Sequence, residues 1–484
     1  MRPFYLLTAT LLLPGCAHAA PPKPDFANLP AYLQALNGSS DPEAKAIRAR
    51  IASGPADLAR ERSLAEKAGL ATRPSQLVQP LPPPAQNAAL LYRQLDALRK
   101  QKPLHFPLYA QSLSGRIAYT PAQIAAVQKE YDARPDIFSL LHQAADKPQC
   151  AFAYEPFNFP PEYAGMRENA RELTTESLLM AYQDKFPEAA ANQMRGFRMS
   201  AHVASSPELF GFLVASAIDT ITVDSLQSIL QKAGPDAALD SRVSADILAL
   251  PPLSLAHALS GEPAEADKIF EIMRSAKPAE LAQSAPEGSP FYGKSPASAS
   301  VRFSPAEKSQ WNALVDAAEA DYLRQMRSIV VAADQPSLMR QAAFKQTKVR
   351  AKANQTDPII ALSDQLNTVV AIDAFLEGGI LETQTLNVQA NLPPARRLVA
   401  AAGACVLAAK AQTGAFPVSL PAQFVDPFTN KPLGYRPEGT NGFVVYSAGP
   451  TGTFDGGKPG DKWDNQKIVF RYPLVPVPVA DRKP

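Results

Sequence analysis

A glycine-rich acidic loop near the carboxyl terminus holds the residues best suited to bind an ion. Asp455, Asp461 and Asp464 place three carboxylates within residues 449–464, among several glycines. Carboxylate oxygens are hard ligands, and glycine lets a short loop fold back so that backbone carbonyls join them. This pattern predicts a calcium site. The alternative is a solvated hairpin loop without an ion.

Residue types that perform catalysis are otherwise scattered. Four histidines follow residue 19, and no two have ligand spacing on one helix: His105, His142, His202 and His257. The sequence has no His-Glu-x-x-His, Cys-x-x-Cys, Gly-x-Ser-x-Gly or phosphate-loop motif. We therefore predict that each histidine is a surface or packing residue, and we assign no catalytic residue. A triad assembled from distant positions stays open as an alternative.

Two further groups raise the question of a groove. Glu172 and Glu176 stand one helical turn apart. They would act as an acid and base pair or belong to a solvated helix face, and we favour the solvated face. Five aromatic residues lie close together in a proline-containing stretch: Phe152, Tyr154, Phe157, Phe159 and Tyr163. They would line a groove for a peptide or glycan, or form a lid packed on helices, and we favour the lid.

The elements that must position these residues are mostly helices. Prolines often follow a capping residue, as in Thr120-Pro121 and Ser304-Pro305, where proline costs no hydrogen bond at the first helical position. Residues 166–183 and 187–204 have helical periodicity and are separated by a short turn, which predicts an antiparallel hairpin. Later hairpins resemble those of tetratricopeptide arrays, without a strict repeat. The predicted class is mainly α, with irregular helical hairpins, tetratricopeptide-like in part, and a small C-terminal α+β module.

The C-terminal module begins with a predicted helix over residues 395–410. Its apolar residues recur at three and four and predict one buried stripe: Leu398, Ala402, Cys405 and Ala409. Predicted strands at 442–446 and 467–472 then bracket the glycine-rich loop. The module therefore combines one helix with strands.

This ending resembles the globular half of type II secretion major pseudopilins. The match includes Gly414-Ala-Phe-Pro417, Asp426-Pro-Phe428 and Val445-Tyr-Ser-Ala-Gly-Pro450. The resemblance implies calcium in the loop, although Thr451 stands where that family usually has an aspartate. A fuller resemblance is to a group of uncharacterised bacterial envelope proteins with a long helical region before the same ending. It implies no activity.

The amino terminus is a predicted targeting segment. Arg2 precedes an apolar run, and Ala17-His-Ala19 is a small-x-small cleavage site. In the alternative, Leu13-Pro-Gly-Cys16 is a lipoprotein box and Cys16 is lipidated. Either way the protein is expected to be exported, periplasmic or attached to the envelope.

Two cysteines remain after cleavage at residue 19. An oxidising compartment would permit Cys150 and Cys405 to form a disulfide. They are far apart in sequence and each has apolar neighbours. We therefore favour two buried small hydrophobic residues over a bridge.

The predicted organisation is sequential. It comprises a signal peptide (1–19), a proline-rich tether with N-terminal helices (20–83), a helical-hairpin domain (84–300), further helices (301–393), the pseudopilin-like module (394–472) and a proline-rich tail (473–484). No later apolar run is expected to span a membrane.

Composition narrows the function. Loss of Arg2 with the signal changes the formal charge from +2 to +1, so nucleic acid and anionic membrane surfaces are not expected partners. We predict a non-catalytic interaction or scaffold protein of the bacterial envelope that binds an envelope or secretion-system protein. A lipid anchor would be its membrane contact. The alternative is a periplasmic hydrolase or a glycan- or peptide-binding protein with a groove in the helical domain.

Overall fold

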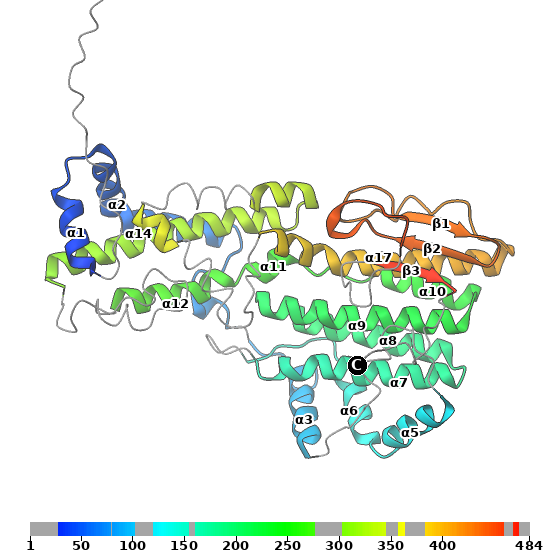
Figure 1. Cartoon of the computed structure of the whole chain (residues 1–484). Helices are drawn as coiled ribbons and strands as arrows, with labels where there is room; N and C mark the ends of the chain where they lie inside the picture. Colours follow the sequence, from blue (N-terminus) through cyan, green and yellow to red (C-terminus); the bar gives the residue numbers. More distant parts are fainter. Residues whose placement is uncertain are drawn as a thin grey trace, which may run out of the picture. The chain divides into compact units, whose positions relative to one another are not determined.

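The computed structural model describes residues 28–78, 80–101, 120–153, 160–275, 303–344, 357–363, 383–458 and 468–473. Within these residues the protein is mainly helical, with a small three-stranded antiparallel sheet near the carboxyl terminus (Figure 1). The mainly helical class predicted from the sequence is confirmed. The predicted signal segment, Cys16 and the proline-rich tail lie outside the described residues, apart from Pro473.

The chain forms two compact units, and neither is continuous in sequence. One comprises Met1–Glu61, Phe270–Tyr322 and Ala351–Val369, and the other comprises Arg62–Ile269, Leu323–Arg350 and Val370–Pro484. The unit boundaries fall inside helices α2 (Pro42–Lys67), α12 (Glu262–Ser275) and α14 (Pro305–Ala333). They differ from the sequential segments expected above, because periodicity along a chain does not reveal which distant helices pack together.

In the smaller unit, α1 (Leu29–Gly38), α2 and α14 bury apolar faces. Gly54 marks the closest approach of α2 to α14, since a Cβ atom there would lie 2.3 Å from the carbonyl oxygen of Ala313. Trp311 is fully buried, and its Nε1 donates to the carbonyl of Met273 at 2.9 Å. The buried residues of α1 recur at three and four, as an amphipathic helix requires: Leu29, Tyr32, Leu33 and Leu36.

The larger unit is built on three helices that pack against one another: α7 (Glu162–Tyr182), α8 (Phe186–Ala204) and α9 (Leu209–Ala233). The predicted hairpin is confirmed, because α7 and α8 are joined by a three-residue turn in which Asp184 has φ 59°. Gly196 allows α8 to approach α9 closely, since a Cβ atom there would lie 2.4 Å from Thr222 Oγ1. Glu208 is extended (φ −130°, ψ 134°), so the helix begins at Leu209.

Shorter helices surround this core: α3 (Ala88–Gln101), α5 (Pro121–Asp132), α6 (Pro135–Ala145), α10 (Ala237–Leu248) and α11 (Leu255–Leu259). The predicted proline starts and capping boxes are confirmed at α5 and α14. Gln123 N donates to Thr120 Oγ1 at 3.3 Å and Thr120 N to Gln123 Oε1 at 2.9 Å. Ser304 and Glu307 make the same reciprocal pair. These bonds satisfy amides that the first turn of a helix leaves free.

The C-terminal module combines α17 (Thr383–Thr413) with strands β1 (Gly434–Glu438), β2 (Gly442–Tyr446) and β3 (Val469–Tyr472), in the order β1-β2-β3. Strand β2 matches the prediction, β3 occupies most of the second predicted strand, and β1 was missed. The predicted start of the module at residue 394 falls inside α17, which continues through Pro393 and Pro394.

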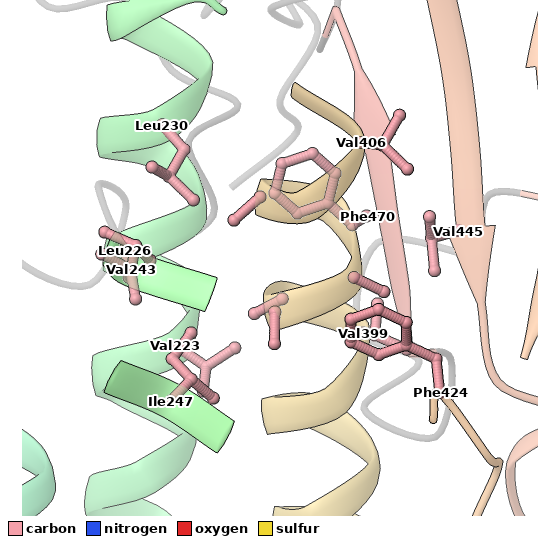
Figure 2. Close-up of a cluster of buried hydrophobic side chains, with 14 of the residues drawn as sticks. Val223, Leu226, Leu230, Val243, Ile247, Val399, Val406, Phe424, Val445 and Phe470 are labelled. Carbon is pink, nitrogen blue, oxygen red and sulfur yellow. The ribbon is translucent and has the colours of Figure 1, made fainter. Parts of the chain in front are cut away.

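Helix α17 is buried almost all round, which corrects the predicted single stripe. It packs on α9 and α10, and the sheet covers another part of its surface (Figure 2). Leu398, Cys405 and Ala409 of the predicted stripe are only half-buried, whereas Val399 and Val406 are fully buried. Gly403 allows the sheet to approach, because a Cβ atom there would lie 2.5 Å from the Phe470 ring.

Two described helices are long and apolar enough to cross a membrane, by length and composition alone: Leu209–Ala233 and Leu386–Thr413. The sequence prediction that no later run approaches such a span therefore fails for these two. In each helix, 72% of the most apolar stretch of 18 residues is buried inside the protein, as in the core helix of a soluble protein. They are weak evidence for a membrane.

Candidate functional site

Helix α7 carries three buried carboxylates, and each binds a side chain from a neighbouring helix. Glu162 accepts from Arg93 Nε at 2.7 Å, and Glu172 receives a two-pronged ion pair from Arg99 at 2.9 and 2.7 Å. Glu172 and Glu176 are 0% and 2% exposed, so the favoured interpretation of a solvated face is wrong. Burial raises the pKa of Glu172, although the Arg99 guanidinium counters this effect. The sequence spacing of these glutamates does not reveal that a partner of Glu172 lies on α3 and that the partners of Glu176 lie on α5, α6 and α8.

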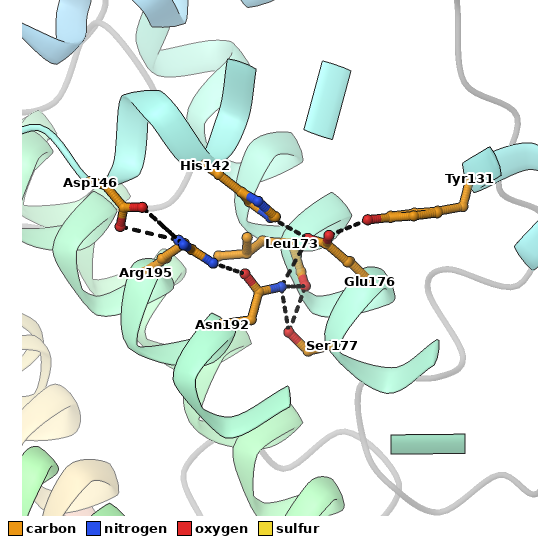
Figure 3. Close-up of polar contacts among 8 residues, drawn as sticks. All are labelled: Tyr131, His142, Asp146, Leu173, Glu176, Ser177, Asn192 and Arg195. Carbon is orange, nitrogen blue, oxygen red and sulfur yellow. Dashed lines mark hydrogen bonds and ion pairs between the residues drawn. The ribbon is translucent and has the colours of Figure 1, made fainter. Parts of the chain in front are cut away.

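The Glu176 carboxylate is the centre of a buried polar cluster (Figure 3). It accepts hydrogen bonds from the hydroxyl of Tyr131 on α5, from Nδ2 of Asn192 on α8 at 2.9 Å, and it lies 2.6 Å from His142 Nε2 on α6. Asn192 also donates to Ser177 Oγ at 3.0 Å. One buried carboxylate thus ties together side chains from α5, α6 and α8.

The chemistry open to this cluster centres on a carboxylate–imidazole pair. A carboxylate that orients an imidazole is the arrangement of a general base, and the His142 side chain is 26% exposed. Burial, followed by the hydrogen bond to Glu176, raises the pKa of Tyr131, so this hydroxyl stays protonated and donates. Within the described residues the His142 ring binds Glu176 alone, and no serine, threonine or cysteine side chain is hydrogen-bonded to it. The pair lacks a nucleophile there.

The Glu176 cluster continues to a surface ion pair. Arg195 Nη1 donates to Asn192 Oδ1 at 3.0 Å, and Arg195 Nη2 pairs with Asp146 at 2.9 Å (Figure 3). Arg198 binds the same Asp146 carboxylate at 2.5 Å. The two arginines hold the pKa of Asp146 below its usual range against the opposing effect of burial. The chain of contacts therefore links α8 to the end of α6.

His202 is a satisfied packing residue, as predicted. Its Nδ1 lies 2.9 Å from the Tyr92 hydroxyl and its Nε2 2.9 Å from the carbonyl oxygen of Lys147. Burial lowers the pKa of His202 to about 4, so the ring is neutral near pH 7. A carbonyl can only accept, so Nε2 carries the proton and Nδ1 accepts from Tyr92.

The remaining predicted site residues are dispersed. Asp455 Oδ1 accepts from Gly457 N at 3.0 Å, whereas Asp461, Asp464 and His105 lie outside the described residues. Among the residues that the structure describes, no three His, Cys, Asp or Glu side chains are placed to hold a metal ion. The calcium site therefore stays a prediction. Tyr163 is buried and contacts Phe152 edge-on at 5.2 Å, which agrees with a packed lid at these two residues.

Cys150 and Cys405 are free thiols in this structure, so the disulfide alternative is not met. Cys150 packs in the cluster around α3, α6 and α7, and Cys405 packs in the cluster around α17 and the sheet. Burial raises the pKa of both thiols. Cys150 is buried as predicted, whereas Cys405 is only half-buried.

Sequence reasoning used Asp426 as part of the pseudopilin resemblance and did not find its structural role. Its buried carboxylate accepts from Ser447 Oγ and Ala448 N, both at 2.9 Å, and from Phe428 N at 3.1 Å and Thr429 Oγ1 at 3.2 Å. It therefore fastens the turn before β1 to the segment after β2. Its distant partners depended on the fold.

Comparison with known proteins found no match among family models, curated proteins or solved structures. The resemblances to major pseudopilins and to bacterial envelope proteins remain predictions from the sequence.

Proposed function

We propose that this protein is an exported, non-catalytic interaction or scaffold protein of the bacterial cell envelope. The observation that carries the proposal is the row of buried carboxylates on α7. Glu162, Glu172 and Glu176 bind side chains of α3, α5, α6 and α8, so polar groups that could act on a substrate connect helices instead. Such connections favour a rigid body that presents surfaces to a partner. The predicted signal segment supports a periplasmic or envelope location, with lipidated Cys16 as the alternative.

The finer architecture belongs to the same proposal. We interpret α17 with its sheet as a pseudopilin-like α+β module, and α7 to α12 as irregular hairpins that are tetratricopeptide-like in part. In a pseudopilin the corresponding helix spans the membrane at the amino terminus, whereas α17 packs on α9 and α10. This packing supports a module that serves as part of a scaffold rather than as a polymerising subunit.

Site-specific photo-cross-linking in living cells tests the proposal and its partner class, an envelope or secretion-system protein. A photoreactive amino acid is placed at Val418, which is 95% exposed, and at Met339, which is 63% exposed. The matched control position is Arg242, whose side chain is 70% exposed on α10. We expect one discrete envelope adduct from an apolar position and none from the control. Equal, diffuse labelling from all three positions in the correctly exported chain would contradict a specific partner.

A hydrolase or glycan- or peptide-binding protein is the second candidate, favoured by the half-exposed His142 beside Glu176. The test incubates the purified full chain with labelled peptidoglycan fragments and with peptides. This candidate predicts turnover or binding that His142→Ala abolishes, while His257→Ala, a control at an exposed imidazole, retains it. Retention of activity in His142→Ala with an unchanged thermal midpoint excludes this site.

A further inference from the structure

Three glutamates meet where the start of α12 packs on the start of α9. Glu262 Oε1 accepts from Leu209 N, the first amide of α9, at 2.9 Å. Glu208 immediately precedes α9 and is 8% exposed, and its Oε1 accepts from Ser206 Oγ at 2.9 Å. Glu265 lies one turn further along α12, and its charge acts on both other carboxyl groups. Three like charges therefore converge on one helix junction.

One oxygen in this junction has no partner within the described residues. Glu208 Oε2 is buried and makes no hydrogen bond there, and the buried hydroxyl of Tyr163 on α7 lies close to Ser206 of the same turn. The charge on Glu208 acts on the pKa of Tyr163, so the two groups lie within electrostatic range of each other. A buried carboxylate oxygen without a donor is costly, whereas a protonated carboxyl group removes that charge and adds a donor.

The backbone at this junction is tightly packed. A Cβ atom on Gly261 would lie 2.1 Å from the carbonyl oxygen of Pro207, so the residue before α12 touches the turn before α9. His257 of α11 contacts the same turn, with its Nε2 3.1 Å from the carbonyl oxygen of Ser205. Backbone therefore lies against backbone where the starts of the two helices meet, beside the carboxylates.

We propose that the α9–α12 junction is a proton-operated latch, in which uptake of a proton by the Glu208–Glu262 pair closes the contact between the helices and its release loosens the contact. The titratable groups adjacent to the pair are Glu265 of α12, Tyr163 of α7 and His257 of α11. The latch responds to the acidity of the medium, which reaches an exported protein directly.

The direction of the pH dependence follows from the electrostatics. Burial, followed by the charges of Glu265 and Glu208, raises the pKa of Glu262 to about 7, and burial raises that of Glu208. A carboxyl group with a raised folded pKa imposes no penalty below the unfolded value of 4.5. The penalty grows as pH rises toward 7 and is constant above it. The latch is therefore closed in mild acid and loosened at neutral to alkaline pH.

Hydrogen exchange of the full chain, measured by mass spectrometry from pH 5 to 8 and corrected for intrinsic exchange rates, tests the latch. The first turns of α9 and α12, followed through the peptides that cover them, are expected to open at least about tenfold more often at pH 8 than at pH 5. A local measurement is needed because other buried groups also make global stability depend on pH: the lowered pKa of His202 favours high pH, and the raised pKa of Asp240 favours low pH. Peptides from α1, which belongs to the other unit, serve as the internal reference.

Variants decide whether the two glutamates are responsible. Glu208→Gln and Glu262→Gln keep the shape and the acceptor oxygen of the side chain but cannot ionise. Each single variant is expected to weaken the pH dependence of hydrogen exchange, and the double variant is expected to abolish it. Glu188→Gln on the exposed start of α8 is the matched control and should leave the profile unchanged. A wild-type profile independent of pH would overturn the proposal, and so would a full pH response in the double variant. If the double variant fails to fold, the wild-type profile and the two single variants decide.

Discussion

Replacement of Arg397 by methionine tests what holds the two apolar helices α9 and α17 together. Arg397 on α17 forms a buried ion pair with Asp219 on α9, at 2.5 and 3.0 Å. It also donates to the carbonyl of Pro251 at 2.7 Å, and its guanidinium lies 5.4 Å from the centre of the Phe197 ring. Methionine keeps much of the apolar stem but removes the charge and the donors. Asp219, which is 1% exposed, would then lose its ion-pair partner and keep only the charge of Arg396 nearby.

The expected loss follows from burial. Removal of one partner from a buried ion pair costs about 3–5 kcal/mol, because the other charge stays desolvated. Loss of the contact with Phe197 adds about 0.5–1 kcal/mol. The double variant Arg397→Met/Asp219→Leu removes both charges and should return to within about 2 kcal/mol of the wild type. The double variant should thus be more stable than Arg397→Met alone by about 1.5 kcal/mol or more.

Urea unfolding followed by far-ultraviolet circular dichroism measures the free energies. Hydrogen exchange of α9 and α17 peptides provides the local measurement, because the protein has two units and a global transition can mix them. Arg436→Met is the matched control. This arginine pairs with Glu438 at 2.7 Å on the surface, and its loss should cost at most about 1 kcal/mol.

Two results would refute the reasoning. If Arg397→Met costs no more than the Arg436→Met control, the ion pair is not desolvated as its burial indicates. If the double variant is as unstable as Arg397→Met alone, the loss comes from packing and not from an unpaired Asp219.

Three further predictions concern the C-terminal part and its neighbours. Asp426→Ala should destabilise the sheet by about 3 kcal/mol or more, because it leaves buried donors without an acceptor. Hydrogen exchange of β2 peptides measures this loss. A loss no larger than that of Asp426→Asn would contradict the prediction. Burial raises the pKa of Asp240 to about 7, so stability falls as pH rises from about 4 to 7. Asp240→Asn should therefore raise the unfolding free energy at pH 8 by about 1–3 kcal/mol in urea titrations and change it little at pH 4. Calcium should raise the midpoint of thermal unfolding relative to a sample with chelator, and Asp455→Asn should reduce that rise. Identical midpoints with calcium and with chelator would rule out a structural ion.

The sequence predicted the local elements well where one local signal sufficed. Thr120-Pro121 and Ser304-Pro305 predicted two helix starts, since a proline after a capping residue serves only the first turn. The hairpin of α7 and α8 followed from two periodic stretches around a short turn. Strand β1 was missed because Gly434 and Pro437 weaken its signal, and only pairing with β2 makes it a strand.

Burial and partners followed from the sequence only in part. The apolar spacing of α17 predicted one stripe, but packing by α9, α10 and the sheet buries the helix nearly all round, and a pattern in one helix cannot count its neighbours. The two units are likewise assembled from distant segments, so no composition shift along the chain marked them.

The candidate site was likewise predictable from the sequence only in part. The sequence by itself determined that Glu172 and Glu176 share one helix face and that His142 is not part of a local motif. Only the tertiary structure decided that this face is buried, since the arginine on α3 and the histidine on α6 are brought to α7 by packing. A carboxylate is stable in an interior only when its partners arrive with it, and those partners are fixed by the fold and not by spacing along the chain.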